Sequence, residues 1–155
     1  MALRPAEQDA QLTARLYHGV EPCEEPRALC AVKVFLEDYQ SAVRMLRICR
    51  LEEKARRGSE DGTVYYGEVG GTADEWLRRM HSIENFIKSL PHMPSKMLLY
   101  YHYIYGDTVE RAAEDLDISR RHAFRLKKRA LALAAACYPL WLAYEREEGH
   151  AKIAE

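Results

Sequence analysis

The sequence has few cysteines and no long apolar run. Its 155 residues include four widely spaced cysteines, Cys23, Cys30, Cys49 and Cys137. This spacing excludes the disulfide framework of small secreted proteins, and the first fifteen residues lack the apolar run of a signal peptide. No stretch approaches the ~20 apolar residues that a membrane span requires. We therefore expect a cytoplasmic protein with no membrane partner.

The chain also lacks patterns typical of catalysis or metal binding. No glycine-rich phosphate loop, nucleophile and base pair, or carboxylate pair with catalytic spacing is visible. Cys23 and Cys30 have His18 nearby, but their separation is unlike the close cysteine pairs of common zinc sites. These absences predict that the protein is not an enzyme and needs neither cofactor nor metal.

Charge is balanced overall but unevenly distributed. The formal net charge is −1. The segment Ser119 to Arg129 carries six Lys or Arg and no acid, whereas Asp107 to Asp117 carries five acids and one Arg. Six neighbouring cations repel one another unless a polyanion offsets them, although a run of charge can also be a solvated helix face. The pattern favours one electropositive element on a nearly neutral body, which is typical of nucleic-acid binding.

Apolar periodicity predicts an all-α fold that begins with a long helical hairpin over residues 31–90. Residues 1–30 contain three prolines and are expected to form a loosely packed lead-in, with at most a short helix near Ala6 to Tyr17. From Ala31 to Arg57, apolar residues recur at steps of four and three. They are Val32, Leu36, Tyr39, Val43 and Leu46.

The segment Gly58 to Thr72 contains Gly, Ser and Asp and predicts a loop before the second helix of the hairpin. Asp74 is the expected N-cap of that helix. Its apolar stripe is Leu77, Met80, Ile83, Ile87 and Leu90. Two such amphipathic helices are expected to pack antiparallel.

Residues 91–147 are expected to form a second unit. Pro94 suits the first turn of a helix that runs to about Tyr105, and Gly106 suits the position just after its end. The predicted inward residues of this helix are Met97, Leu98, Tyr101, Ile104 and Tyr105. Core packing is favoured over a base-stacking platform for its aromatic residues, because such platforms usually lie on sheets.

The segment from Thr108 to Leu131 predicts two short helices joined by a tight turn. Thr108 is an N-cap candidate, and the inward face of its helix holds Val109, Ala112, Ala113 and Leu116. In the turn, Asp117 tolerates a left-handed backbone, Ile118 packs into the core, and Ser119 caps the next helix. That helix, residues 119–131, has Ala123, Leu126 and Ala130 facing inward and its basic side chains facing outward.

This arrangement predicts a helix-turn-helix that reads the major groove of double-stranded DNA. Arg120, Arg121 and Arg125 are expected to donate bidentate hydrogen bonds to guanine. Phe124 either contacts a thymine methyl group or packs against Pro94 or Tyr103, and both alternatives stay open. The expected phosphate contacts come from the Thr108 hydroxyl and the amides at the start of its helix, and from four flanking side chains, His122, Lys127, Lys128 and Arg129. Ser119, as the cap of the basic helix, completes the expected DNA-binding set.

The apolar segment from Leu131 to Tyr144 needs a covering surface. Pro139 is expected to bend or end its helix near Tyr138. The segment either packs on the hairpin of its own chain or forms a homodimer interface, and we favour the homodimer.

The motif Asp117-Ile118-Ser119-Arg120 resembles the helix-turn-helix of region 4 in bacterial sigma-70 factors. Together with the hairpin and the stretch Tyr100 to Gly106, it resembles the small prophage regulators of the RinA and ArpU type, over about residues 31–135. This resemblance implies a phage or prophage transcription regulator that also contacts RNA polymerase. The chain departs from the sigma pattern at Arg121, where that pattern has Glu.

Two other functions compete with transcription regulation. A minimal sigma factor would require a basic, aromatic promoter-melting segment, which residues 31–57 do not contain. A DNA-packaging protein such as a small terminase subunit also joins a helix-turn-helix to oligomerising helices. Oligomer size distinguishes packaging from regulation.

Overall fold

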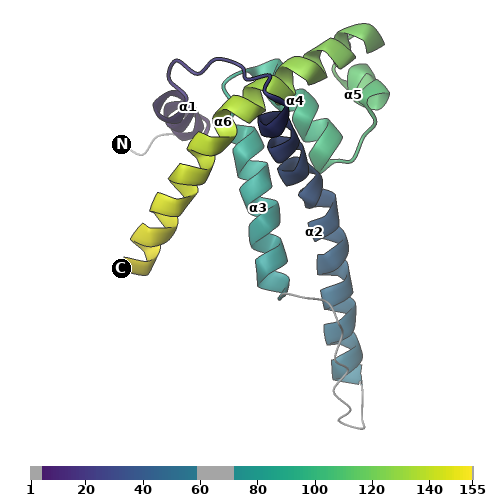
Figure 1. Ribbon diagram of the computed structural model, residues 1–155. Helices are drawn as coiled ribbons and strands as arrows, with labels where there is room; N and C mark the ends of the chain where they lie inside the picture. The colour runs from purple at the N-terminus through teal and green to yellow at the C-terminus, as the bar shows by residue number, and fades with distance from the viewer. Residues whose placement is uncertain (1–4, 59–71, 155) are drawn as a thin grey trace.

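The computed structural model describes residues 5–58 and 72–154, and these residues are all-helical, as predicted. The elements are α1 (Pro5–Leu16), α2 (Pro26–Gly58), α3 (Ala73–Ser89), α4 (Met93–Leu99), the π-helical turn η1 (Tyr100–Ile104), α5 (Val109–Asp115) and α6 (Arg120–Ala154). Figure 1 shows α2 and α3 side by side, with α6 crossing over one end of the pair. No helix among these residues is both long enough and apolar enough to cross a membrane. The loop predicted between α2 and α3 lies almost wholly outside the described residues.

The long first helix of the pair starts earlier than the sequence pattern predicts. It begins at Pro26 rather than Ala31 and continues for 33 residues. Proline is well tolerated in the first turn of a helix, because the amide groups there have no intrahelical acceptor. The predicted apolar stripe holds, since Val32 and Leu36 are fully buried and Tyr39 and Leu46 are nearly so.

Helix α3 is capped two residues before the predicted position. Its N-cap is Thr72, whose hydroxyl accepts a hydrogen bond from the Glu75 amide, while the Glu75 carboxylate accepts one from the Thr72 amide. This reciprocal pair is a capping box, which satisfies two amides at once. The predicted cap, Asp74, instead lies in the first turn, where its charge favours the helix dipole.

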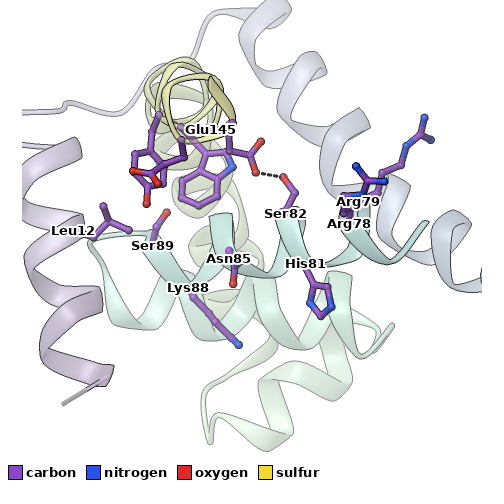
Figure 2. A pocket seen from close by; sticks show the side chains of 13 residues that line it. Leu12, Arg78, Arg79, His81, Ser82, Asn85, Lys88, Ser89 and Glu145 are labelled. Carbon is purple, nitrogen blue, oxygen red and sulfur yellow. Dashed lines mark hydrogen bonds between the residues drawn. The ribbon is translucent and has the colours of Figure 1, made fainter. Parts of the chain in front are cut away.

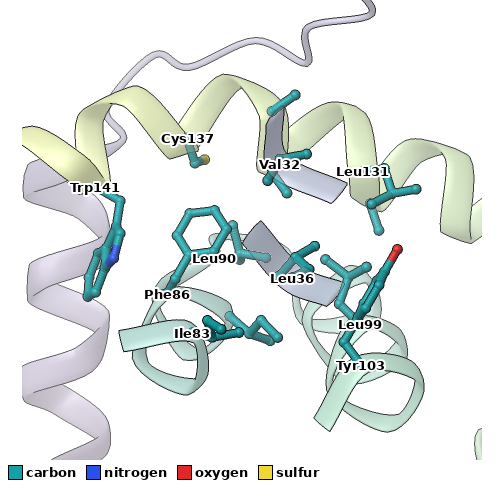
Figure 3. Close-up of a cluster of buried hydrophobic side chains, with 14 of the residues drawn as sticks. Val32, Leu36, Ile83, Phe86, Leu90, Leu99, Tyr103, Leu131, Cys137 and Trp141 are labelled. Atoms are coloured by element: carbon teal, nitrogen blue, oxygen red, sulfur yellow. The ribbon is translucent and has the colours of Figure 1, made fainter. Parts of the chain in front are cut away.

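One hydrophobic core joins α2, α3, α4, η1 and α6. Figure 3 shows side chains from these elements meeting around Phe86. Phe86 is fully buried and has three aromatic neighbours, Phe35, Tyr138 and Trp141, with ring centroids 5.6, 5.8 and 6.0 Å away. Burial of one such side chain contributes about 1.5–3 kcal/mol. Because this core crosses residue 90, the predicted hairpin and the predicted second unit share it.

Helix α6 does not end near Tyr138. It runs from Arg120 through Pro139 to Ala154 and is 35 residues long. The expectation that Pro139 ends the helix is therefore wrong. Ala134 and Cys137 before the proline and Trp141 after it are buried in the shared core and hold the helix in place on both sides of Pro139. Burial of these three side chains outweighs the backbone hydrogen bond that Pro139 cannot donate. The apolar segment therefore packs mostly within its own chain, and the homodimer stays a prediction.

The lead-in is more tightly packed than predicted. Tyr17 is 5% exposed, and its hydroxyl lies 2.7 Å from the Ser89 hydroxyl in the core. Thr13 donates a 2.7 Å hydrogen bond to the Ser89 carbonyl, and the Cys23 amide donates one of 2.9 Å to the Ala132 carbonyl. These contacts tie residues 13–23 to the C-terminal end of α3 and to an internal turn of α6, which sequence periodicity could not show.

The helix after Pro94 changes from α to π geometry at Tyr100. Pro94 lies in the first turn and Gly106, at φ 75°, follows the end, both as predicted. The N-cap is His92, for which no prediction was made. The inward face differs from the prediction. Met97 and Tyr105 are 37% and 63% exposed. Leu98 and Ile104 are buried as predicted, and Leu99 and Tyr103, which the prediction did not place inward, are buried as well. Leu98 packs with Ala112 and Leu126, and the other three lie in the shared core.

The π-helical turn is fixed by a side chain from α2. The Gln40 amide nitrogen donates hydrogen bonds to the carbonyls of Tyr103 and Ile104, at 3.1 and 3.0 Å. Widened turns often leave carbonyls without their usual helical donors, and buried carbonyls need partners. Gln40 thus couples the α2–α3 pair to the segment that leads into α5.

Candidate nucleic-acid interface

The segment after η1 is built by local capping. Thr108 lies before α5, and its hydroxyl accepts a hydrogen bond from the Arg111 amide at 3.2 Å. At the other end, the Ile118 amide donates to the Ala113 carbonyl and the Asp117 amide to the Glu114 carbonyl. This pair of bonds is a Schellman motif, which needs a left-handed residue after the cap. Asp117 takes that role with φ 55°, as predicted.

Ser119 starts α6 as predicted. Its hydroxyl accepts a hydrogen bond from the His122 amide at 3.1 Å, and its carbonyl accepts one from the Ala123 amide at 2.9 Å. Capping by serine at this position contributes about 1 kcal/mol to helix stability. The turn between α5 and α6 is therefore four residues long in total, 116–119, and tightly hydrogen-bonded.

Small side chains let α6 cross close to α5. Ala123 is fully buried and packs with Val109 and Ala113 of α5. Leu126 packs with Leu98 and Ala112, and Ala130 lies in the shared core. The predicted inward stripe is confirmed, because the residues at positions 123, 126 and 130 are 0, 6 and 0% exposed. The same stripe continues along α6 into the shared core.

The opposite side of α6 is a continuous basic surface. The predicted site residues in α6 are all exposed except Lys127, which is half-buried. One shallow hollow on this surface is lined by Arg120, Arg121, Phe124, Arg125 and Lys128. A second hollow is lined mainly by Ser119, Arg121, His122, Arg125 and Arg129. A third hollow is lined by Phe124, Lys127 and Lys128, among others. The three hollows together hold nine of the ten predicted site residues. Thr108 lines none of the three.

Most of the positive charge on this surface has no acidic partner. Among the described residues, Arg120 is the one member of the segment 119–129 that forms an ion pair, with Glu110 of α5 at 3.3 Å. Its guanidinium carbon also lies 5.7 Å from the centre of the Phe124 ring. The remaining five cations are held at the surface by the buried stripe beneath them, so their charge is available to a polyanion.

Phe124 is 44% exposed and lies between two hollows. On one side it borders the arginines of α6, and on the other it borders Leu29 and Lys33 of α2. Its ring is therefore partly shielded by α2 and partly presented on the basic surface. The part that stays exposed is large enough to make an apolar contact with a ligand.

A larger hollow, of about 750 Å³, lies between α1, α3 and the C-terminal half of α6. Figure 2 shows that its polar side chains do not converge, because His81 and Lys88 extend away from α6. Glu145 accepts a hydrogen bond from Ser82. Within the part of the chain that the structure describes, no group of three or more His, Cys, Asp or Glu could hold a metal. The basic surface of α6 is therefore the stronger candidate site.

A comparison of this chain with protein-family models, curated proteins and solved structures found no match.

One residue of the basic surface was missed by sequence reasoning. Lys33 of α2 lines the same hollow as Phe124, Lys127 and Lys128. Its position in the sequence, inside a helix with mixed charges, gave no indication of this contact. Only the crossing of α2 and α6 places it there.

Proposed function

We propose that this chain is a sequence-specific regulator that binds double-stranded DNA, with α5 and α6 forming a helix-turn-helix. The observation that carries the proposal is the division of α6 into two faces. Ala123, Leu126 and Ala130 are buried, and the side chains across the helix are basic and exposed. An α-helix with such a face fits the major groove, which is about 12 Å wide.

The proposed roles follow from the chemistry of each side chain. Arg121 and Arg125 line both hollows on the exposed face, and guanidinium groups donate two parallel hydrogen bonds to guanine O6 and N7. Arg120 has the same capacity once it leaves Glu110. The exposed part of Phe124 suits a thymine methyl group. His122, Lys127 and Arg129 lie toward the edges of the face, Lys128 lies one turn beyond the arginines, and all four suit phosphates.

The rigid attachment of α6 supports sequence-specific binding. Its basic segment and the mostly buried stretch 130–137 belong to one helix, so the core fixes the direction in which the basic face points. Rigid presentation reduces the ordering that binding would otherwise require. We propose further that the protein acts in the cytoplasm on a phage or prophage promoter and contacts RNA polymerase, as its resemblance to sigma region 4 implies.

Regulation is favoured over DNA packaging by one observation. The apolar segment of α6, which could have joined neighbours in a ring-forming packaging protein, instead packs mostly in the core of its own chain. Light scattering distinguishes the two functions, because regulation predicts a monomer or dimer and packaging predicts a ring of many subunits.

The test is a selection of bound genomic fragments, followed by salt-titrated fluorescence anisotropy on the selected duplex and on a random duplex. We expect the selection to converge on one sequence and the selected duplex to bind roughly 10³-fold or more tightly. Convergence on no sequence would contradict the proposed specificity.

Two triple variants distinguish the effect of the basic surface on DNA binding from the effect of net charge. Arg121, Arg125 and Lys128 are replaced by alanine in one variant, and Arg44, Arg47 and Arg50, which are exposed on α2, in the other. Both lose three positive charges. We expect only the first to lose binding, because the second removes charge outside the proposed interface. Equal losses would show that binding follows net charge alone.

A further inference from the structure

Beside the basic face of α6 lies a hollow that it shares with the start of α2. Lys33 of α2 and Lys127 and Lys128 of α6 line it, and Phe124 separates it from the arginines. Its apolar lining comes from Leu29, Leu131 and Ala132. Two helices that are far apart in the sequence therefore place three lysines around one hollow.

The position of Lys33 is fixed by packing rather than by a flexible contact. Val32, the residue before it, is fully buried in the shared core, as is Leu36 one turn later. The Cys23 amide bonds to the Ala132 carbonyl and holds the chain before α2 against α6. Lys33 itself is exposed. The backbone of Lys33 is thus held beside α6, while its side chain lines the hollow and reaches solvent.

The two edges of the α6 face differ. Along one edge, His122 and Arg129 line a hollow with Ser119. Along the other edge, Lys127 lies with Lys33, and Lys128 borders the same hollow from the middle of the face. A helix 10–12 Å across nearly fills a major groove ~12 Å wide, so the two phosphate strands run along its two edges.

We infer that Lys33 is a phosphate-contacting residue, which extends the DNA interface from α6 onto α2. This inference rests on the proposed function. Lys33 and Lys127 meet the strand on the α2 side, and His122 and Arg129 meet the opposite strand. An ammonium group suits this role because it binds phosphate as a point charge without reading a base. Glu24 lines the same hollow and opposes the attraction.

The experiment compares Lys33→Ala with Lys54→Ala in salt-titrated anisotropy. Both lysines are exposed on α2, and they are about 32 Å apart along the helix. We expect Lys33→Ala to lower the slope of log K against log salt by about 0.9 and to weaken the selected and random duplexes by the same factor. Lys54→Ala should bind like wild type. Glu24→Gln should strengthen binding to both duplexes.

Two outcomes would overturn the inference, and they are distinguishable. If Lys33→Ala matches Lys54→Ala while Arg125→Ala loses binding, Lys33 lies outside the interface and the proposed function stands. If the wild-type protein fails to bind either duplex at low salt, the proposed function fails and the inference with it. Circular dichroism of each variant checks that the helices are intact, and Lys33→Arg should restore the salt slope.

Discussion

Glu110 of α5 and Arg120 of α6 form an ion pair across the turn that joins their helices, with a distance of 3.3 Å between oxygen and nitrogen. Both side chains are well exposed, so the pair contributes little to stability. Its effect is on the position of Arg120, which is held between the carboxylate and the Phe124 ring. An acidic side chain therefore restrains the first cation of the basic surface.

Replacement of Glu110 by Gln should release Arg120 toward DNA. We expect an increase in affinity of up to about fivefold, because an exposed ion pair is worth roughly 0.2–1 kcal/mol. The matched control is Glu114→Gln, which removes the same charge from α5. The native Glu114 pairs with Arg111 of its own helix, at 3.8 Å, and not with the basic surface. Anisotropy on the selected duplex and on its single-base variants is the measurement. A change in base preference with Glu110→Gln, but not with Glu114→Gln, is the expected result.

The arginines and lysines of α6 should differ in their effect on specificity. Arg125→Ala should reduce the preference for the selected duplex by about 1–3 kcal/mol, since it removes a bidentate contact to a base. Lys128→Ala should weaken all duplexes alike and lower the salt slope by about 0.9. Competition between the selected and random duplexes at two salt concentrations measures both effects. Identical losses for the two variants on every duplex would show that Arg125 does not read bases.

Much of this surface could be predicted from the sequence because its determinants are local. The caps at Thr108 and Ser119 and the left-handed Asp117 depend on residues a few positions away. The inward stripe at 123, 126 and 130 follows from helical periodicity. These features need no knowledge of which helix packs against which.

The missed features depend on contacts between distant segments. Lys33 adjoins α6 only because α2 starts beside it, and Tyr17 is buried because it joins the core, where its hydroxyl meets Ser89. The exposure of Tyr105 follows from the π-helical turn, which disrupts the spacing assumed for an α-helix. Helix α6 continues through Pro139 because burial in the shared core outweighs the tendency of proline to break a helix.

The crossing of α5 and α6 should not tolerate a large side chain. Ala113 is 3% exposed and packs with Val109 and Ala123, so Ala113→Leu should destabilise the protein by about 1–3 kcal/mol. For a chain of this length that is a fall in melting temperature of roughly 2–12 °C. Thermal unfolding by circular dichroism measures it. Ala143→Leu, at an exposed position on α6, is the control and should melt like wild type.

The buried thiol of Cys137 should make the protein sensitive to alkaline pH. Burial raises the pKa of this thiol from 9.0 to about 12. A raised pKa in the folded state means that the unfolded state loses its proton first as pH rises. The associated stability is thus complete below pH 9 and is lost between pH 9 and about 12. In that window the free energy of unfolding should fall by about 1.4 kcal/mol per pH unit from this group alone.

Urea unfolding of the Cys137→Ala variant at several pH values above 9 isolates this contribution. The variant is expected to be less stable at neutral pH, because Cys137 is fully buried in the shared core. The slope of its unfolding free energy against pH should nevertheless be shallower than that of wild type, by the equivalent of close to one proton. Tyr103, whose pKa burial raises to about 12, leaves a residual slope in both proteins. Cys30→Ala, at an exposed cysteine, should keep the wild-type slope. Parallel slopes for wild type and Cys137→Ala would mean that the thiol already ionises within the folded protein.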